Sequence, residues 1–176
     1  MTNEHWRYFQ TLEEDIEKTT RFVEPVSANF KTYSVEFVRL ILSICSEVDV
    51  VAKVLCALID PTRTVNDMDD YRLVITTKYP KLHTTKVSID RFGLTFEPWK
   101  EWGNGVNPGW WRDHQQVKHR RHEAFALADF EHCLNAAAGL FCLVLYANRM
   151  NLEPLRREAR LFNTSATPGY RFVLPD

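Results

Sequence analysis

Hydrophobic residues recur at steps of three and four in two long segments of the chain, residues 34–60 and 127–149. The apolar positions are Phe37, Leu40, Ile44, Val48, Val51, Leu55 and Leu58 in the first segment and Leu127, Phe130, Leu134, Ala138, Phe141 and Leu145 in the second. This spacing places an apolar stripe along one face of an α-helix. The pattern therefore predicts two long core helices, the first with Ser34 as its N-cap.

Shorter helices are predicted at residues 5–22, 66–79 and 110–122, the second of them capped by Asn66 or Asp67. Between 85 and 96 the apolar residues alternate around Asp90-Arg91-Phe92-Gly93, which indicates a β-hairpin. We therefore expect an all-α single domain over residues 1–176. It carries a hairpin and loop insertion at about 84–109 and an irregular C-terminal tail at about 160–176.

The loop from 98 to 109 contains Trp99 and Trp102. Exposed tryptophans in such a loop could stack on nucleic-acid bases. The interpretation we favour is that they cover the edge of the core, because tryptophan contributes most through its buried area.

The helix predicted at 110–122 combines a phosphate-binding side chain with a proton-transfer side chain. Arg112 and His119 are seven positions apart, so on an α-helix they share one face about 10 Å apart along the axis. Gln115 and Gln116 lie between them. Arginine binds phosphate oxygens with a permanent charge, and histidine transfers protons near neutral pH. The spacing favours phosphodiester chemistry, and the alternative is a solvated polar face.

The same segment is locally basic in a chain whose net charge is only −1. Between Arg112 and His122 the only acidic residue is Asp113, which either orients the Arg112 and His119 side chains or favours the helix N-terminus through the macrodipole. Lys118 and Arg121, one turn apart on a continuous helix, suit backbone phosphates or are simply solvated. A local patch of this kind attracts polyanions. The pI near 6.6 argues against a dedicated DNA-binding protein.

The motif Arg112-Asp113-x5-His119, which opens a helix ahead of a long apolar one, resembles the HEPN superfamily (higher eukaryotes and prokaryotes nucleotide-binding). Similar segments are Trp110-Trp111 before the motif, Val117-Lys118-His119-x-Arg121 within it, and Cys45-Ser46-Glu47-Val48 on the earlier helix. The resemblance extends over about residues 34–150 and is to a bacterial subgroup. It departs at His114-Gln115, where that subgroup is expected to carry Tyr-Asn.

This resemblance implies an up-and-down helical bundle and an endoribonuclease that works without a metal or cofactor. RNA would be cleaved through its own 2′-hydroxyl, with Arg112, His119 and Asp113 as catalytic residues and Lys118, Arg121, Gln115 and Gln116 as RNA-binding residues. The family commonly assembles as a homodimer, in which two Arg–His pairs share one cleft. Glu47 and Lys53 could face that cleft or be exposed helix positions, and His122 is a further candidate.

Other functions are compatible with the same residues. One is a non-catalytic module that binds RNA, a nucleotide or a protein, since fold does not fix activity. Another is a toxin or phage-defence ribonuclease controlled by an antitoxin or other regulatory protein. A zinc site is suggested by four of the six histidines, His114, His119, His122 and His132. His119 and His122 have chelating spacing, but no fourth ligand set with cysteine or carboxylate spacing is evident. The chain has neither a phosphate-binding Gly-x-x-x-x-Gly-Lys loop nor a Gly-x-Gly-x-x-Gly turn.

The cysteines and the N-terminus bear on the compartment. All four cysteines lie in apolar helical runs, which is typical of reduced core residues in a cytoplasmic protein. The first residues form no apolar signal region. The apolar run at 134–147 is shorter than the roughly 20 residues that span a bilayer, and the segment 35–59 carries charges, so no membrane span is predicted.

Overall fold

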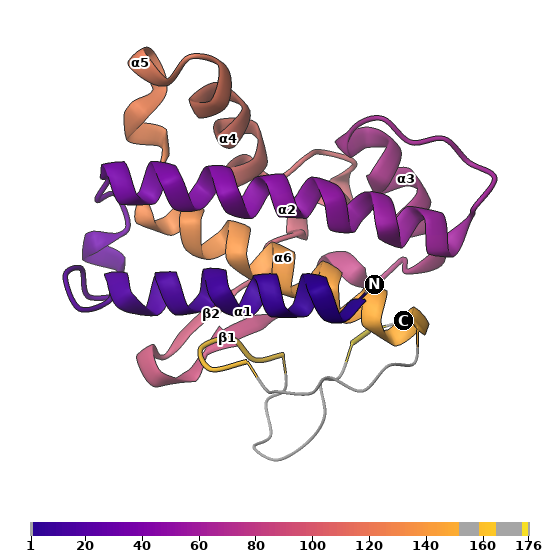
Figure 1. The fold of residues 1–176 in the computed structure, drawn as a ribbon, viewed down its shortest axis with the longest axis horizontal. Coiled ribbons are helices and arrows are strands. Elements are labelled where there is room, and N and C mark those ends of the chain that lie inside the picture. The colour runs from indigo at the N-terminus through magenta and orange to yellow at the C-terminus, as the bar shows by residue number, and fades with distance from the viewer. Residues whose placement is uncertain (1, 152–158, 165–173, 176) are drawn as a thin grey trace.

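The computed structural model describes residues 2–151, 159–164 and 174–175. This part of the chain is mostly helical, with six α-helices and one small antiparallel hairpin (Figure 1), so the predicted fold class is confirmed. The two predicted core helices are α2 (Val35–Ile59) and α6 (Phe130–Asn151), and they pack against each other. Helix α1 (Thr2–Thr19) lies beside α2, with α6 behind both in the view of Figure 1.

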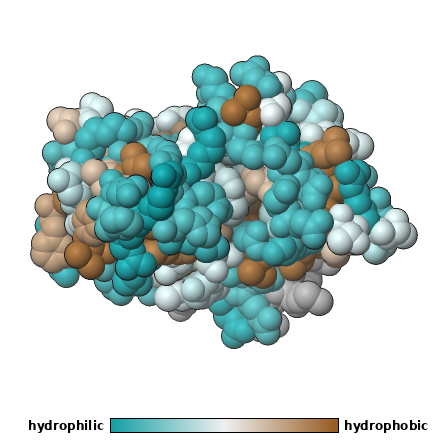
Figure 2. Space-filling view, turned by 90° about the horizontal axis from the view of Figure 1, so that it is seen from above, coloured by the Kyte–Doolittle hydropathy of each residue, from teal (hydrophilic) through white to brown (hydrophobic). Residues whose placement is uncertain are grey.

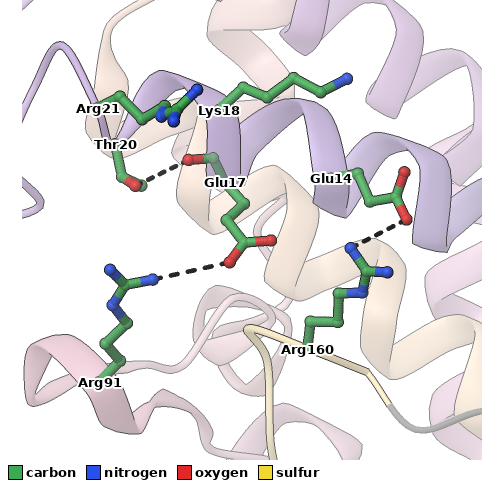
Figure 3. A pocket seen from close by; sticks show the side chains of 7 residues that line it. All are labelled: Glu14, Glu17, Lys18, Thr20, Arg21, Arg91 and Arg160. Carbon is green, nitrogen blue, oxygen red and sulfur yellow. Dashed lines mark hydrogen bonds and ion pairs between the residues drawn. The ribbon is translucent and has the colours of Figure 1, made fainter.

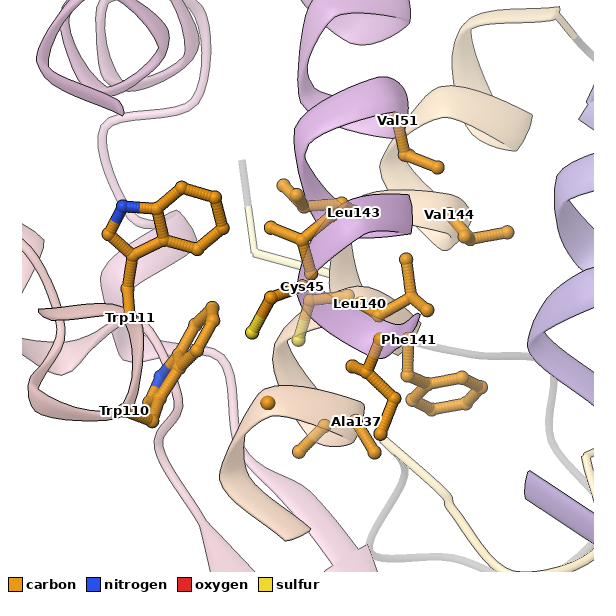
Figure 4. Close-up of a cluster of buried hydrophobic side chains, with 14 of the residues drawn as sticks. Cys45, Val51, Trp110, Trp111, Ala137, Leu140, Phe141, Leu143 and Val144 are labelled. Atoms are coloured by element: carbon orange, nitrogen blue, oxygen red, sulfur yellow. The ribbon is translucent and has the colours of Figure 1, made fainter. Parts of the chain in front are cut away.

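The apolar stripes of the three long helices form one core. Phe37 of α2 stacks on Phe130 of α6 with ring centroids 4.9 Å apart, and Phe9 of α1 stacks on Phe141 of α6 at 5.2 Å. The four cysteines are buried in this core as free thiols, as their apolar surroundings predict. Figure 4 shows Cys45 among the core side chains next to Trp110 and Trp111.

Local capping explains where two helices begin. Ser34 accepts a hydrogen bond from the backbone N–H of Phe37 at 3.1 Å, as predicted for the start of α2. Asp67 accepts from the N–H groups of Asp69 and Asp70 and so begins α3 (Met68–Lys78). Helix α3 packs on α2.

The predicted motif helix is shorter than expected. Helix α4 runs over Gly109–His119 and stops at Arg120, whose backbone angles of φ −137° and ψ 47° are not helical. The prediction that it continues to residue 122 is wrong. The reason is that its buried stripe would continue from Val117 onto Arg120 and Arg121, and arginine is almost never fully buried without a partner. The chain turns instead through the short helices α5 (Arg121–Ala124) and η5 (Phe125–Leu127) into α6.

The predicted hairpin consists of β1 (Val87–Ile89) and β2 (Leu94–Phe96). Its turn, η3 (Asp90–Phe92), ends at Gly93 with φ of 63°, a left-handed conformation that favours glycine. The outer edge of β1 is covered, because Ser88 and Asn163 exchange backbone hydrogen bonds of 2.7 and 2.9 Å. The hairpin thereby holds part of the C-terminal segment.

That C-terminal segment is irregular, as predicted, but over residues 160–163 it is packed onto the bundle. Leu161 and Phe162 are buried. The buried carboxylate of Glu13 accepts hydrogen bonds of 2.8–3.1 Å from the backbone N–H groups of Arg160, Leu161 and Phe162. Burial raises the pKa of Glu13, and these three hydrogen bonds oppose the shift. Residues 165–173 and 176 of the expected tail lie outside the described part.

Trp99 and Trp102 belong to the core, as favoured above. Trp99 is fully buried, its ring centroid lies 4.1 Å from that of Trp102, and its Nε1 donates to the carbonyl oxygen of Gly139 at 3.1 Å. Trp110 packs on Gly139 so closely that a Cβ atom there would lie 2.9 Å from the indole. Trp102 lies in the helix η4 (Lys100–Asn104). These tryptophans dock the start of α4 onto α6 and are not free for base stacking.

Helix α6 extends beyond the apolar run at 134–147 at both of its ends. An 18-residue window within Phe130–Met150 has a mean hydropathy of 1.4, so the helix meets the length and composition of a membrane span. The run at 134–147 is shorter than a span, and it is the helix containing it that is long enough. Of that window, 83% is buried inside the bundle, which is the pattern of a core helix.

Candidate functional site

Helix α4 presents one face to the core and the opposite face to solvent. Trp110, Trp111 and Val117 are buried against the bundle, whereas Arg112 and His119 are exposed. This agrees with the prediction that Arg112 and His119 share one face of the helix. Figure 2 views the molecule from the side of α4, α5 and α3, and the surface there is mainly hydrophilic. The candidate pair thus lies on an accessible polar surface.

The Arg112 side chain is directed towards the start of its own helix. Its Nη2 lies 3.8 Å from the place that a Cβ atom on Gly109 would occupy, and Glu101 Oε1 lies 3.9 Å from the same place. His119 is the last residue of α4, so the guanidinium lies near the start of the helix and the histidine at its end. Within the described residues, neither side chain is held by an ion pair or a hydrogen bond. One chain alone therefore does not bring the guanidinium and the imidazole together.

Asp113 contacts a residue other than those it was expected to orient. Its Oδ1 accepts a hydrogen bond from Gln116 Nε2 at 3.2 Å, and its Oδ2 lies 3.5 Å from Nε2 of His132 on α6. The other ring nitrogen of His132 lies 2.9 Å from the carbonyl oxygen of Leu127. Asp113 consequently joins α4 to α6 and contacts neither Arg112 nor His119. The sequence suggests His132 only as a possible metal ligand, and nothing in the separation of Asp113 and His132 along the chain signals this contact.

The predicted RNA-binding residues lie on two separate elements. Lys118 is exposed at the end of α4, and Arg121 is exposed at the start of α5. The break at Arg120 removes the helical relationship expected between them. Gln115 and Gln116 are half-buried.

His122 pairs with an acidic neighbour on α5. Its Nε2 lies 3.3 Å from Glu123 Oε1, and Arg120 Nη1 lies 4.0 Å from Glu123 Oε2. Glu123 therefore partly offsets the basic patch at the end of α4.

Glu47 and Lys53 of α2 take part in contacts away from Arg112 and His119. Glu47 Oε1 lies 2.6 Å from His5 Nδ1, which joins α2 to α1. Lys53 pairs with Asp49 at 2.5 Å, and Asp49 accepts a hydrogen bond from Tyr71 of α3 at 2.8 Å. Both side chains serve contacts between or along the bundle helices.

His114 lies on the buried face of α4, at the position where the sequence resemblance led us to expect tyrosine. It is 3% exposed, and its ring lies 5.1 Å from that of Trp111. Burial, with smaller effects from Lys118 and His119, lowers the pKa of His114 to about 4. Its Nδ1 has no hydrogen-bond partner among the described residues. His114 is therefore a neutral packing residue and is not available for proton transfer at the surface.

Of two cavities at the surface, one lies away from α4 and the other lies beside it. One of about 300 Å³ lies beside α1, where Glu14 pairs with Arg160 at 3.2 Å and Glu17 with Arg91 at 3.7 Å (Figure 3). Its opposite charges face each other across the cavity. The other, of about 250 Å³, adjoins the end of α4 and is lined by Gln116, Arg120, Glu123, Ala124, Ala126 and Leu127.

The described residues contain no cluster of three or more histidine, cysteine, aspartate or glutamate side chains arranged to hold a metal ion. His119 and His122, which had chelating spacing on a continuous helix, lie on different helices. Comparison of the chain with models of known families, with curated proteins and with solved structures finds no match. The resemblance to the HEPN superfamily therefore stays a prediction from the motif.

Proposed function

We propose that this protein is a metal-independent endoribonuclease in which Arg112 and His119 carry the chemistry. The observation that supports it is that both side chains are exposed on α4 and that neither takes part in an ion pair within the described residues. A guanidinium and an imidazole committed to structural ion pairs would be less available to a substrate. The local basic character of α4 adds attraction for a polyanion.

RNA supplies its own nucleophile, the 2′-hydroxyl. Cleavage needs a base to remove the proton of that hydroxyl, an acid to protonate the leaving 5′-oxygen, and positive charge at the crowded phosphorus. His119 provides a proton-transfer group, and Arg112 provides the charge. The 2′-oxygen bonds to phosphorus as the bond to the 5′-oxygen breaks, which leaves a 2′,3′-cyclic phosphate and a 5′-hydroxyl.

A second copy of the chain completes this site in the proposal. In an antiparallel pair of α4 helices around a two-fold axis, the Arg112 side chain of one copy, which leans towards its helix start, would approach His119 at the helix end of the other. Two histidines in one cleft would then divide the roles of base and acid. Control by an antitoxin or another regulatory protein is compatible with this arrangement.

The alternative is a non-catalytic RNA-binding module. It is favoured by one observation, namely that Asp113 contacts Gln116 and His132 and so leaves His119 without a carboxylate to orient it.

The test is incubation of single-stranded RNA with the full chain in the presence of a chelator. Because His119 transfers the proton and Arg112 stabilises charge, His119→Ala and Arg112→Ala should each reduce the cleavage rate by about a hundredfold or more. Arg63→Ala, which changes an exposed arginine between α2 and α3, is the control and should change it little. Products should carry 2′,3′-cyclic phosphate ends, and a 2′-deoxy substrate should be inert.

Each other outcome has a distinct meaning. Cleavage that persists in both variants, or that the chelator abolishes, would contradict the proposed site. RNA binding by the wild type without cleavage would favour the non-catalytic module.

A further inference from the structure

The cavity of about 250 Å³ beside α4 exists because the helix breaks at Arg120. The chain folds back there, so that α5 and η5 face the last turn of α4. Two lining residues bracket His119 in the sequence, with Gln116 three positions before it and Arg120 directly after it. The cavity is therefore a neighbour of the proposed catalytic histidine.

The lining combines an apolar surface with hydrogen-bonding groups. Ala124 is buried and Leu127 is half-buried, whereas Arg120 and Glu123 are exposed. Gln116 donates through Nε2 to Asp113, which contacts His132 in turn. This contact directs the amide and leaves the Gln116 carbonyl oxygen as a hydrogen-bond acceptor. The volume is below the roughly 300–1,000 Å³ of sites for drug-sized ligands and suits a single planar ring system.

We propose that this cavity accepts a guanine base of the RNA and selects the site of cleavage. The inference rests on the proposed ribonuclease function for its biological meaning. Guanine presents two neighbouring N–H donors, at N1 and N2, which match the carboxylate of Glu123. It also presents O6 and N7 as acceptors, and the arginine fork suits this pair best among the bases. Ala124 and Leu127 provide an apolar surface for the ring.

The contact between the Arg120 and Glu123 side chains is weak enough for a ligand to replace it. Arg120 and Glu123 lie 4.0 Å apart, with side chains 61% and 62% exposed. Exposed ion pairs of this kind contribute little to stability. Adenine would place its amino donor opposite the guanidinium, and pyrimidines lack the second ring. The charges around the cavity thus distinguish guanine from the other bases.

The test measures binding of guanosine 3′-monophosphate, compared with the adenosine, cytidine and uridine 3′-monophosphates, by calorimetry and by backbone amide shifts. The guanosine nucleotide should bind about tenfold or more tightly than the others, and shifts should concentrate at residues 116–127. Glu123→Gln should remove most of this preference, whereas Glu24→Gln, an exposed glutamate before α2, should retain it.

Equal binding of the four nucleotides, or shifts centred elsewhere, would overturn the guanine assignment. The measurement involves no cleavage. A guanine preference in a protein that cuts no RNA would support this cavity while contradicting the ribonuclease proposal.

Discussion

Asp113 of α4 lies 3.5 Å from His132 of α6, with its Oδ2 facing the Nε2 atom of the imidazole. The two side chains are 25% and 19% exposed, so the pair is largely shielded from solvent. Both ring nitrogens of His132 face oxygen atoms, Nε2 that of Asp113 and Nδ1 those of the Leu127 carbonyl and the Asp129 carboxylate. The pair therefore joins the helix of the candidate site to the core helix beneath it.

Because Asp113 joins α4 to α6, we expect its substitution to change the free energy of unfolding more than the rate of RNA cleavage. Asp113→Asn and His132→Gln should each lower the free energy of unfolding by about 1 kcal/mol, measured by urea denaturation. Together they should lower it by less than the sum, because both remove the same contact. His119→Ala should leave the unfolding midpoint nearly unchanged. A loss of RNA cleavage in Asp113→Asn at unchanged stability would instead assign Asp113 to the catalytic group.

Helical periodicity was sufficient to predict the core helices, since Ser34, Asp67 and the apolar stripes act within a few residues of one another. The same reasoning failed at Arg120, because a helix ends where its stripe can no longer be buried, and that depends on the core it meets. The partners of Asp113 and Glu47 could not be predicted either. Those contacts join segments distant in sequence, and no local pattern encodes them.

The contacts of Glu13 predict that its substitution destabilises the C-terminal segment at residues 160–162. Glu13→Ala leaves the buried N–H groups of Leu161 and Phe162 and the part-buried N–H of Arg160 without their acceptor and should cost about 2–3 kcal/mol. Glu13→Gln should cost less, since one oxygen remains to accept from Leu161 and Phe162. Hydrogen exchange should accelerate at these amides.

Glu14→Ala is the control, because Glu14 is the half-exposed neighbour of Glu13 and pairs with the Arg160 side chain. Exchange that stays slow in Glu13→Ala would show that the packing of Leu161 and Phe162, with the backbone hydrogen bonds between Asn163 and Ser88, holds the segment without Glu13.

His114 predicts a pH dependence of stability. Its pKa is about 4 in the folded protein, below the ordinary histidine value of 6.5 that applies in the unfolded chain. The unfolded chain therefore binds a proton that the folded chain resists, so stability is full above about pH 6.5 and falls as the pH drops towards 4. The total loss from this residue is about 3 kcal/mol.

The measurement is urea denaturation of wild type and His114→Phe at several pH values between 4 and 7.5. Phenylalanine fits beside Trp111 without a titratable group, so the difference between the two proteins should grow as the pH falls. A constant difference across this range would contradict the desolvation of His114.

The composite site predicts that two inactive variants restore each other. Arg112→Ala retains His119, and His119→Ala retains Arg112, so a mixed dimer contains one guanidinium and one imidazole in the shared cleft. After the two variants are unfolded together and refolded, cleavage should rise several-fold above that of either variant alone. Light scattering should show a dimer at micromolar concentration. If each chain instead forms a complete site by itself, every copy in the mixture lacks one group, and cleavage should stay at the level of the single variants.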